Sequence, residues 1–357
     1  MSSYDLAVIG AGSAGFSAAI TAAEQGAHVA LIGHGTIGGT CVNVGCVPSK
    51  TMIRATEALH QANTGRFAGI QASGQLADWG AIVGQKDELV ASLRQSKYTD
   101  QLENYPSIDY RPGAAAFNGD GLLFDGAPLA AEKTVIACGS QASVPDIAGI
   151  KDTPFLTSTT AFALEQLPGS ILLIGGGYIG CEVAQMLARA GVAVTIACRS
   201  RLLPEGEPEI SDALRGYLRD EGLTVMDGLS YESIERTGTG VALRVETDGA
   251  AQVLQAERLL LSAGRRPNTQ GLGLEQAGIK TRANGGIAID ERMRTSRANV
   301  YAAGDVTGRD QFVYMAAHGA KIAAQNALNG DSQVYDNNAM PAVVFTDPQV
   351  ATVGLTE

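Results

Sequence analysis

The feature that most constrains this chain is a glycine-rich pattern that occurs twice, each time between an apolar run and an alanine-rich run. The first copy spans residues 4–33, with the sequence YDLAVIGAGSAGFSAAITAAEQGAHVALIG. The second copy spans residues 170–200, with the sequence SILLIGGGYIGCEVAQMLARAGVAVTIACRS. Each copy predicts a strand, a glycine turn, a helix closed by a glycine, and a second strand, which together make a complete βαβ unit. We therefore expect an α/β fold with two Rossmann-like domains.

The second βαβ unit is expected to form a domain inserted into the first. Pro145, Pro154 and Pro168 mark a loop-rich stretch before it, and the segment ERLLLSAGRRPN after it ends a strand at Gly264. The apolar segment NVYAAGD and the helical segment HGAKIAAQNAL then indicate a return to the first domain. We predict domain segments at 1–145, 146–264 and 265–335, with a further segment at 336–357 that holds two β-rich runs.

The glycines of each turn match the pattern GxGxxG between a strand and a helix, which is the context that gives this pattern its meaning. The first glycine allows the tight turn, the second lets the backbone approach a pyrophosphate, and the third lets helix and strand pack. A merely structural turn is the alternative. The predicted cofactor-binding glycines are Gly10, Gly12 and Gly15 in the first copy and Gly175, Gly177 and Gly180 in the second.

Neither copy has the acid that usually ends the second strand and holds the ribose hydroxyls. Gly33 and His34 stand at that place in the first copy, so adenosine loses a charge-assisted hydrogen bond there, which costs about 1.5–3 kcal/mol. In the second copy, Arg199 and Arg201 stand where a 2′-phosphate would lie. Guanidinium groups suit phosphate, so we predict a preference for NADP over NAD. The alternative is that both arginines solvate a surface loop.

Charge and composition exclude several classes of protein. The formal net charge of −11 argues against a nucleic-acid-binding surface and against a polybasic membrane anchor. The uncharged stretch 6–23 follows an aspartate, has no preceding lysine or arginine and is interrupted by glycines, so it does not match a secretory signal. Five cysteines are few and odd in number, which fits a cytoplasmic protein whose thiols are reduced unless they are catalytic.

One cysteine pair stands out. Cys41 and Cys46 lie in GGTCVNVGCVPSK, and five residues of regular helix would separate them by about 7.5 Å, too far for a relaxed disulfide. Joining them needs a distorted helix start, which Gly45 allows. A redox-active pair beside a dinucleotide site is the favoured interpretation. A zinc site and a pair of inert buried thiols remain as alternatives. The other cysteines, Cys138, Cys181 and Cys198, lie in apolar patterns that indicate core packing.

These residues resemble the pyridine nucleotide-disulfide oxidoreductases, a family of flavoenzymes, over essentially the whole chain. The segment GGTCVNVGCVPSK is highly specific for this family, and YAAGD matches its second flavin motif. Within the family, the segments LRQSKYTDQL, QFVYMAAHGAK and AMPAVVFTDPQVATVG resemble those of the mercuric reductases more than those of the lipoamide or glutathione enzymes. The resemblance implies FAD in the first domain, NADPH in the second, and an α+β interface domain that starts near residue 336.

The resemblance also assigns roles to single residues. Lys50 would lie against the flavin and form a buried ion pair with Glu182 that links the two cofactor domains; otherwise Glu182 lies on a solvated helix face. Tyr178 would gate the flavin or simply pack, and Tyr98 would be an active-site tyrosine or an amphipathic helix residue. Cys46 would be the thiolate facing the flavin and Cys41 the outer one. Further implied cofactor contacts are Gly35, Gly38, Gly39, Thr40, Gly113, Ala115, Gly264, Asp305 and Val313.

Three departures from the family pattern accompany the resemblance. Gly33 replaces the usual acid, and Cys138 stands where a threonine is usual. We also expect no N-terminal metal-trafficking domain with its own cysteine pair. The interface domain would run on for about 100 residues, so we expect the chain to be part of a longer enzyme.

The function that the resemblance implies is NADPH-dependent reduction of Hg(II), presented as a thiol complex, to Hg(0). Electrons would pass from NADPH through FAD to the Cys41–Cys46 disulfide, and the resulting thiolates would hold the metal in a linear site. The full-length enzyme would be a cytoplasmic homodimer that binds neither nucleic acid nor membrane. A dihydrolipoamide dehydrogenase or another dithiol reductase is one alternative. A non-catalytic fragment that binds FAD or a metal is another.

Overall fold

The computed structural model describes residues 3–65 and 67–354, which divide into two compact units. Unit 1 takes its described residues from Met1–Asn43, Leu89–Gln141 and Arg265–Met340. Unit 2 takes its described residues from Val44–Glu88, Ala142–Gly264 and Pro341–Glu357. Each unit is built around its own parallel sheet.

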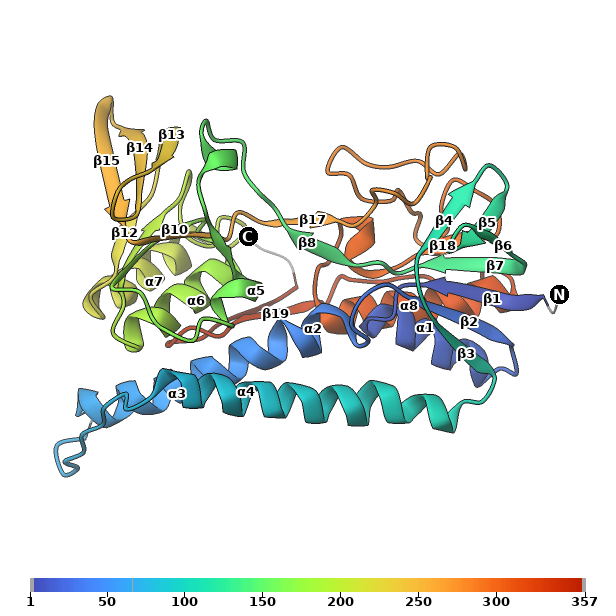
Figure 1. Ribbon diagram of the computed structural model, residues 1–357, viewed down its shortest axis with the longest axis horizontal. Coiled ribbons are helices and arrows are strands. Elements are labelled where there is room, and N and C mark those ends of the chain that lie inside the picture. The colour runs from blue at the N-terminus through green and yellow to red at the C-terminus, as the bar shows by residue number, and fades with distance from the viewer. Residues whose placement is uncertain (1–2, 66, 355–357) are drawn as a thin grey trace. The chain divides into compact units, whose positions relative to one another are not determined.

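Unit 1 contains a five-stranded parallel sheet with the strand order β18-β7-β1-β2-β3. Its helices α1 and α8 lie side by side on one face, and the small antiparallel sheet β4-β5-β6 lies on the other (Figure 1). The bounds are β1 Tyr4–Ile9, α1 Ser13–Ala23, β2 Val29–Gly33, β3 Ile108–Pro112, β4 Ala115–Asn118, β5 Gly121–Phe124, β6 Ala127–Leu129, β7 Ala131–Ile136, β18 Val300–Ala302 and α8 Val313–Asn329.

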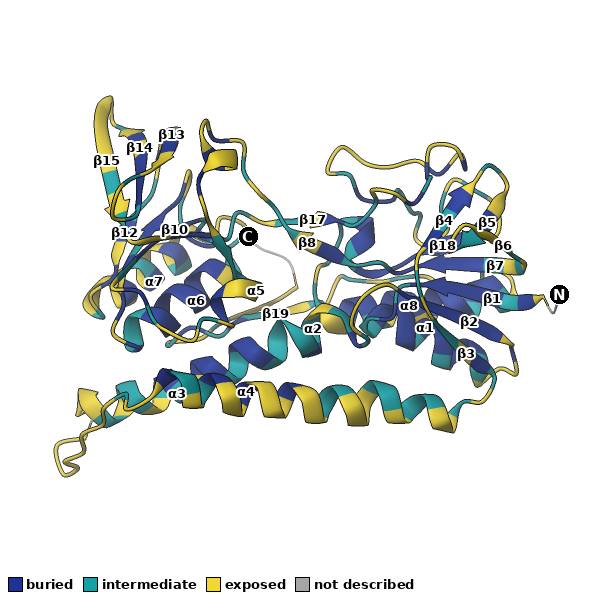
Figure 2. Ribbon diagram, viewed as in Figure 1, coloured by how far each residue is buried: buried dark blue, intermediate teal, exposed yellow. Residues whose placement is uncertain are grey.

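Both faces of this sheet are buried, which explains why its strands are almost continuously apolar. Leu6 and Val8 point to the face covered by α1 and α8, while Ala7 and Ile9 belong to the core on the opposite face. The alanines of α1 allow the helix to approach the sheet and α8 closely, since they fill little space. Figure 2 shows the strands and the inner helix faces as buried.

Unit 2 repeats this design with the strand order β12-β11-β10-β16-β9, all parallel. Helices α5, α6 and α7 cover one face, and the antiparallel sheet β13-β14-β15 packs on the other (Figure 1). The bounds are β9 Leu156–Thr157, α5 Ser158–Ala161, β10 Ser170–Ile174, α6 Tyr178–Arg189, β11 Ala193–Ala197, α7 Pro208–Asp220, β12 Thr224–Met226, β13 Ser230–Arg236, β14 Val241–Thr247, β15 Ala250–Ala256 and β16 Arg258–Leu261.

The remaining elements surround these sheets. In unit 2, α3 packs against α6, and the hairpin of β19 and β20 is antiparallel. Helix α4 continues into a π-helical turn at Gln95–Thr99 and a 3₁₀ turn at Asp100–Asn104. The other bounds are α2 Gly39–Asn43, α3 Cys46–Thr64, α4 Trp79–Arg94, β8 Ser140–Ala142, a 3₁₀ turn at Ile150–Asp152, β17 Arg265–Pro267, a 3₁₀ turn at Gly304–Thr307, β19 Pro341–Val344 and β20 Val350–Val353.

The two predicted βαβ units are both present, and 142–264 is an uninterrupted stretch of unit 2. One difference concerns 44–88, which the sequence placed in the first domain and which packs with unit 2 in the structure. The division into cofactor domains stays a prediction, because compactness does not show what a unit binds. The antiparallel sheets β4-β6 and β13-β15 were not anticipated.

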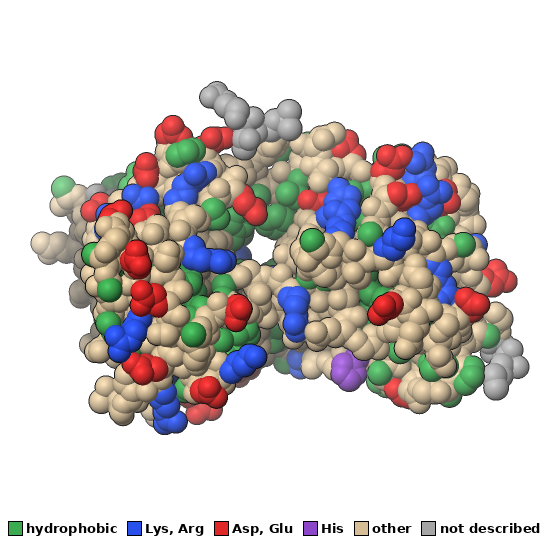
Figure 3. All heavy atoms as spheres, turned by 90° about the horizontal axis from the view of Figure 1, so that it is seen from above, with side chains coloured by type: hydrophobic (Ala, Val, Ile, Leu, Met, Phe, Trp, Pro, Cys, Tyr) green, Lys and Arg blue, Asp and Glu red, His purple; other side chains and the backbone are tan. Residues whose placement is uncertain are grey.

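The surface carries side chains of both charges. On the face seen in Figure 3, lysine and arginine side chains are interspersed with aspartate and glutamate on each unit. In the described part of the chain, no helix is both long enough and apolar enough to cross a membrane.

Candidate functional site

The first glycine of each turn is required by the backbone. Gly10 and Gly175 have φ values of 119° and 116°, which side-chain-bearing residues rarely adopt. A Cβ at Gly10 would lie 2.2 Å from the carbonyl oxygen of Ala137, and one at Gly175 would lie 2.3 Å from that of Ser262. In both units the turn is therefore in close contact with the residue that follows a neighbouring strand, β7 in unit 1 and β16 in unit 2.

The third glycine of each turn lets the helix pack on the turn itself. A Cβ at Gly15 would lie 1.7 Å from the carbonyl oxygen of Gly10, and one at Gly180 would lie 2.3 Å from that of Gly175. No side chain can be accommodated at either distance. The two sites thus share one construction, as the sequence predicted.

The middle glycine of each turn is less crowded than the other two. A Cβ at Gly12 would meet its nearest neighbour, the Cα of Gly39, at 3.4 Å, and one at Gly177 would meet nothing within 4 Å. Helices α1 and α6 begin directly after these glycines, and neither first turn has a side-chain cap or an acidic residue. The backbone N–H groups there are available to an anion, so both turns fit a dinucleotide pyrophosphate.

A second glycine loop supports the turn of unit 1. Gly38 donates its N–H to the carbonyl oxygen of Ala11 at 2.8 Å, and a Cβ at Gly39 would lie 2.6 Å from the Cα of Gly12. Thr40 follows in α2 and is exposed. The structure therefore brings the predicted loop of residues 38–40 against the first glycine turn.

The other predicted flavin contacts of unit 1 are more scattered. Gly35 is exposed after β2, Ala115 is buried at the start of β4, and Val313 begins α8 with 36% of its surface exposed. A Cβ at Gly113 would lie 2.5 Å from the Asp125 carboxylate, so local packing already explains that glycine.

Asp305 lies in the 3₁₀ turn Gly304–Thr307 and is held by two residues that sequence reasoning missed. Ser140 donates its hydroxyl to the Asp305 carboxylate at 2.6 Å, and the Arg265 Nε donates to the Ser140 Oγ at 2.7 Å. Arg265 also lies 3.7 Å from the carboxylate. The position of Asp305 is therefore fixed by a short chain of hydrogen bonds. The only sequence signal was the polar SAGRRPN stretch at a strand end.

Tyr98 lies in the π-helical turn after α4, a type of helical irregularity that is frequent at functional sites. Its hydroxyl is 3.0 Å from the Oγ of Ser13, the first residue of α1, and its ring meets Phe16 edge-on at 4.9 Å. The structure thus brings Tyr98 to the start of α1. Its role as an active-site tyrosine stays a prediction.

The cysteine segment has the distorted geometry that the spacing requires. Helix α2 ends at Asn43, α3 begins at Cys46, and Gly45 between them has φ −122° and ψ −104°, outside the helical and extended regions. The predicted interruption at Gly45 is therefore confirmed. Cys41 and Cys46 are both partly exposed.

Asn43 and Arg94, which the sequence did not indicate, form hydrogen bonds that fix the first half of this segment. The side-chain amide of Asn43 donates to the carbonyl oxygens of Ile37 and Gly39, each at 2.9 Å. Arg94, the last residue of α4, donates to the Asn43 side-chain oxygen at 3.0 Å. The turn that carries Cys41 is thereby fixed from both sides.

Lys50 and Glu182 form the ion pair that the family resemblance implied, with 2.6 Å between Nζ and Oε2. Both residues belong to unit 2, so the pair joins α3 to α6 inside one unit rather than linking two domains. The Glu182 side chain is 6% exposed and that of Lys50 is 35% exposed. Glu182 is therefore not the solvated helix residue that the alternative described.

Phe345 adds two contacts to this pair that the sequence did not indicate. Its backbone N–H donates to the Glu182 Oε1 at 2.9 Å, and its ring lies 4.7 Å from the Lys50 Nζ. Glu182 thus uses one carboxylate oxygen for the ammonium and the other for the backbone. The cation rests on an aromatic face, which is favourable for a lysine.

The predicted nucleotide residues of unit 2 occupy different environments. Tyr178 is the first residue of α6, and burial raises the pKa of its hydroxyl, with Glu205 adding to the effect. Gly264 is exposed after β16. Arg199 is exposed, whereas Arg201 donates from Nη2 to the carbonyl oxygens of Gly206 at 2.6 Å and Pro204 at 3.2 Å. Arg201 therefore stabilises its own loop, which leaves Arg199 as the more accessible guanidinium.

The core assignment of the other three cysteines is confirmed. Cys181 and Cys198 are buried in the core of unit 2, and Cys138 packs at the edge of the core of unit 1. Burial raises the pKa of each of these thiols to about 12. All three are protonated at neutral pH, and Cys181 and Cys198 are also buried.

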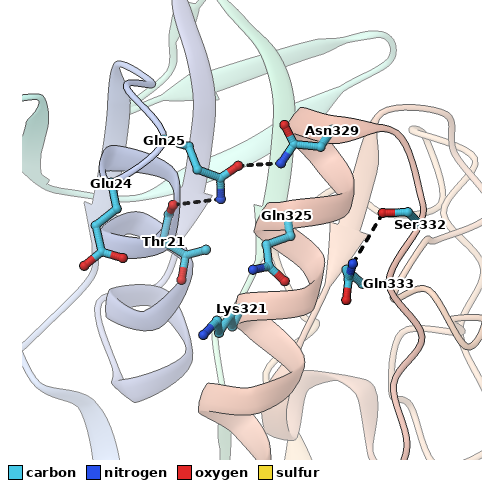
Figure 4. Close-up of a pocket in the computed structure, with 8 residues that line it drawn as sticks. All are labelled: Thr21, Glu24, Gln25, Lys321, Gln325, Asn329, Ser332 and Gln333. Carbon is cyan, nitrogen blue, oxygen red and sulfur yellow. Dashed lines mark hydrogen bonds between the residues drawn. The ribbon is translucent and has the colours of Figure 1, made fainter.

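No group of three or more histidine, cysteine, aspartate or glutamate side chains that could hold a metal ion occurs within residues 3–65 and 67–354. A polar pocket of about 330 Å³ lies between the C-terminal parts of α1 and α8 (Figure 4). It lies at the end of α1 opposite to the glycine turn. Its lining residues are Thr21, Glu24, Gln25, Lys321, Gln325, Asn329, Ser332 and Gln333.

Several known proteins are similar to this chain in sequence. A family model described as pyridine nucleotide-disulphide oxidoreductase matches residues 4–324. The chain is 44% identical to the mercuric reductase of Staphylococcus aureus over 356 residues, which are 99% of this chain and 65% of that protein. It is 45% identical to the mercuric reductase of Streptomyces lividans over 362 residues, covering 99% of this chain and 76% of that protein. The chain belongs to the pyridine nucleotide-disulphide oxidoreductase family.

A solved structure supports the same fold. The Cu(II) complex of the HOCl-induced flavoprotein disulfide reductase RclA from Escherichia coli has a TM-score of 0.86 and 33% identity, and it covers 100% of this chain and 78% of that chain. Membership of this oxidoreductase family implies FAD and NADPH as cofactors. The chain spans about two thirds of the length of the first of these mercuric reductases.

Proposed function

We propose that this chain is the cofactor-binding and dithiol-bearing part of an NADPH-dependent flavoenzyme that reduces Hg(II) to Hg(0). The observation that carries the proposal is the identity of 44% and 45% to two mercuric reductases over 99% of the chain. The helix interruption at Gly45 and the Lys50–Glu182 pair support it, since they provide a shaped dithiol segment and a buried charge next to it.

The residues around the two glycine turns fit the two cofactors. FAD would be held at the first turn by the N–H groups of α1, the 38–40 loop and Asp305, with Gly35, Gly113, Ala115 and Val313 as further contacts. NADPH would be held at the second turn by the N–H groups of α6, with Tyr178, Arg199, Arg201 and Gly264 nearby. When bound, these cofactors supply the two electrons, so that Hg(II) and NADPH give Hg(0), NADP⁺ and a proton.

The chain's own residues bind and orient the metal. Cys41 and Cys46, as thiolates, are soft ligands that suit a soft metal, and two ligands are enough for linear coordination. Lys50 follows Cys46 by one helical turn, so its ammonium stabilises negative charge on that side of α3. Glu182 fixes this ammonium from α6 and is itself fixed by the N–H of Phe345. Tyr98 would contribute its hydroxyl beside the first turn.

A second candidate is reduction of a disulfide or dithiol substrate. It is favoured by the similarity to the flavoprotein disulfide reductase of E. coli. A non-catalytic fragment that binds FAD or a metal is the third candidate.

We also propose that the full-length protein is a cytoplasmic homodimer, on the family resemblance and the cysteine content. The net charge of −11 supports the absence of nucleic-acid binding.

Stopped-flow mixing of the NADPH-reduced protein with thiol-complexed Hg(II) separates these candidates. Flavin reoxidation together with mercury vapour is expected for the favoured function. Rapid turnover of lipoamide without vapour would establish the dithiol reductase instead, and Hg(II) binding without flavin reoxidation would leave only the binding fragment.

Variants of the cysteines make the experiment specific. Cys41→Ser and Cys46→Ser should each abolish mercury reduction, because one thiolate cannot form the two-coordinate site. Cys138→Thr is the matched control, since threonine is usual at this position in the family, and it should retain activity.

A further inference from the structure

The end of β2 lacks the side chain that the first dinucleotide site needs. In Rossmann domains an acid about 20 residues beyond the glycine turn holds the ribose hydroxyls. Gly33 ends β2 and follows Gly12 by about 20 residues, so it stands at that position without a side chain. Either the ribose is held by another group or it is not held at this point.

The structure has another side chain in this space. A Cβ at Gly33 would lie 2.8 Å from the Oη and 2.9 Å from the Cε2 of Tyr110, and 2.9 Å from the Cβ of Ala11. Tyr110 comes from β3, which pairs with β2 in parallel and places Pro112 opposite Gly33. The Tyr110 phenol and a side chain at residue 33 therefore exclude each other.

The Tyr110 hydroxyl is fixed and available. Its ring packs against the apolar cluster formed by α1, α8 and the sheet. No residue within 3–65 and 67–354 hydrogen-bonds the hydroxyl. Burial raises its pKa, so the group is protonated at neutral pH and can donate. Its neighbours on β3 are engaged elsewhere, since Asp109 accepts a hydrogen bond from Tyr4 and the Arg111 guanidinium lies 4.3 Å from the Phe124 ring.

We propose that Tyr110 takes the place of the missing acid and that its hydroxyl hydrogen-bonds the adenosine ribose of the dinucleotide held at the first glycine turn. This inference rests on the proposed binding of FAD at that turn. It accounts for Gly33, because any side chain there would displace the phenol. A neutral hydroxyl binds a ribose less strongly than a carboxylate does, so the adenosine end is recognised more weakly than in relatives with an acid.

The test measures flavin affinity rather than turnover. The purified protein is freed of flavin and titrated, by flavin fluorescence, with FAD and with an FAD analogue whose adenosine ribose lacks both hydroxyls. Tyr110→Phe keeps the ring and removes only the hydroxyl. One neutral hydrogen bond corresponds to a loss of affinity of roughly 2- to 12-fold. We expect Tyr110→Phe to weaken FAD binding by this factor and to leave the binding of the analogue unchanged.

Two further variants keep the result interpretable. Tyr217→Phe removes a half-exposed hydroxyl in unit 2 and should alter neither affinity. Gly33→Ala places a methyl group against the phenol and should reproduce the selective loss for FAD without removing the hydroxyl.

Three results would overturn the inference. Tyr110→Phe could leave FAD affinity unchanged while the wild-type protein binds FAD and reduces Hg(II), in which case the proposed function stands alone. It could weaken FAD and the analogue equally, which would mean a packing role for the tyrosine. Failure of the wild-type protein to bind FAD would remove both the inference and the proposed function.

Discussion

At the scale of single residues, the structure separates the five cysteines into two chemical classes. Cys41 and Cys46 lie on either side of a helix interruption and are partly exposed. Cys181 and Cys198 are buried in the core of unit 2, and Cys138 packs partly buried against the core of unit 1. Burial raises the pKa of each of these three thiols to about 12. Because the thiolate is the nucleophile, reactivity should follow this division.

We therefore predict selective alkylation of the NADPH-reduced protein. At pH 8, a thiol with a pKa of about 12 is ionised to roughly one part in ten thousand, so iodoacetamide should label Cys41 and Cys46 and spare the other three. Labelling of the buried cysteines should increase only as the pH rises toward 12 or when the protein unfolds. Peptide mapping by mass spectrometry checks this. Labelling of Cys181 at a rate similar to that of Cys46 would contradict it.

The two arginines after β11 allow a second prediction at this scale. Arg201 is engaged with backbone carbonyl oxygens, whereas Arg199 is exposed. If Arg199 binds the 2′-phosphate, Arg199→Ala should raise KM for NADPH by roughly 10- to 100-fold, because one charge-assisted hydrogen bond is lost. KM for NADH should change little. Equal effects on both nucleotides would mean that the arginine has a structural role.

At the scale of elements, α6 holds the segment that follows β19. Glu182 and Gln185 are three residues apart on one face of α6, and they accept the backbone N–H groups of Phe345 and Asp347 at 2.9 and 2.8 Å. Arg189, one turn further, donates to the Asp347 carboxylate at 3.0 Å. One face of α6 thus binds two residues of the bend that follows β19, Phe345 and Asp347. This arrangement also sets the position of the Phe345 ring over Lys50.

Gln185 is the central residue of this face of α6 and should be important for the stability of unit 2. Its side chain is 3% exposed, and it also donates to Glu221 at 2.8 Å and to the Asp347 carbonyl oxygen at 2.9 Å. Gln185→Leu should lower the free energy of unfolding by about 2–3 kcal/mol, since three hydrogen bonds are lost. Denaturant titration measures this change.

The matched control for Gln185→Leu is Glu235→Gln. Glu235 pairs with Arg244 on the surface, where both side chains are more than half exposed. Removing such a pair should change the free energy of unfolding by less than about 0.5 kcal/mol. If Gln185→Leu changes stability no more than this control does, this face of α6 does not hold the segment.

Elements whose signal is local could be predicted from the sequence, while contacts between distant segments could not. The strands β1 and β10, the glycine turns and the interruption at Gly45 follow from short-range pattern and backbone geometry. Three contacts join residues that are far apart in the chain. They are the hydrogen bonds of Ser140 and Arg265 around Asp305, the contact of the Phe345 ring with Lys50, and the packing of Tyr110 at Gly33. The antiparallel sheets were missed because their strands alternate only weakly; β15, for example, is almost entirely exposed.

At the scale of the whole molecule, two units of similar construction each contain a glycine turn at the start of a helix, and unit 2 also carries Cys46, Lys50 and Glu182. Repetition of one design explains why the chain is rich in glycine, with 44 among its 357 residues. The chain spans about two thirds of the length of the first similar mercuric reductases. The central claim is that these units, through their dithiol, deliver electrons from NADPH to Hg(II).

The most direct test of that claim is the stoichiometry of mercury vapour to NADPH. The anaerobic wild-type protein with FAD is supplied with a limiting amount of NADPH and an excess of thiol-complexed Hg(II), and the Hg(0) released is measured together with the NADPH consumed. The account predicts one Hg(0) per NADPH for the wild-type protein and no vapour for the double variant Cys41→Ser, Cys46→Ser. Consumption of NADPH without vapour, or undiminished vapour from the double variant, would contradict it.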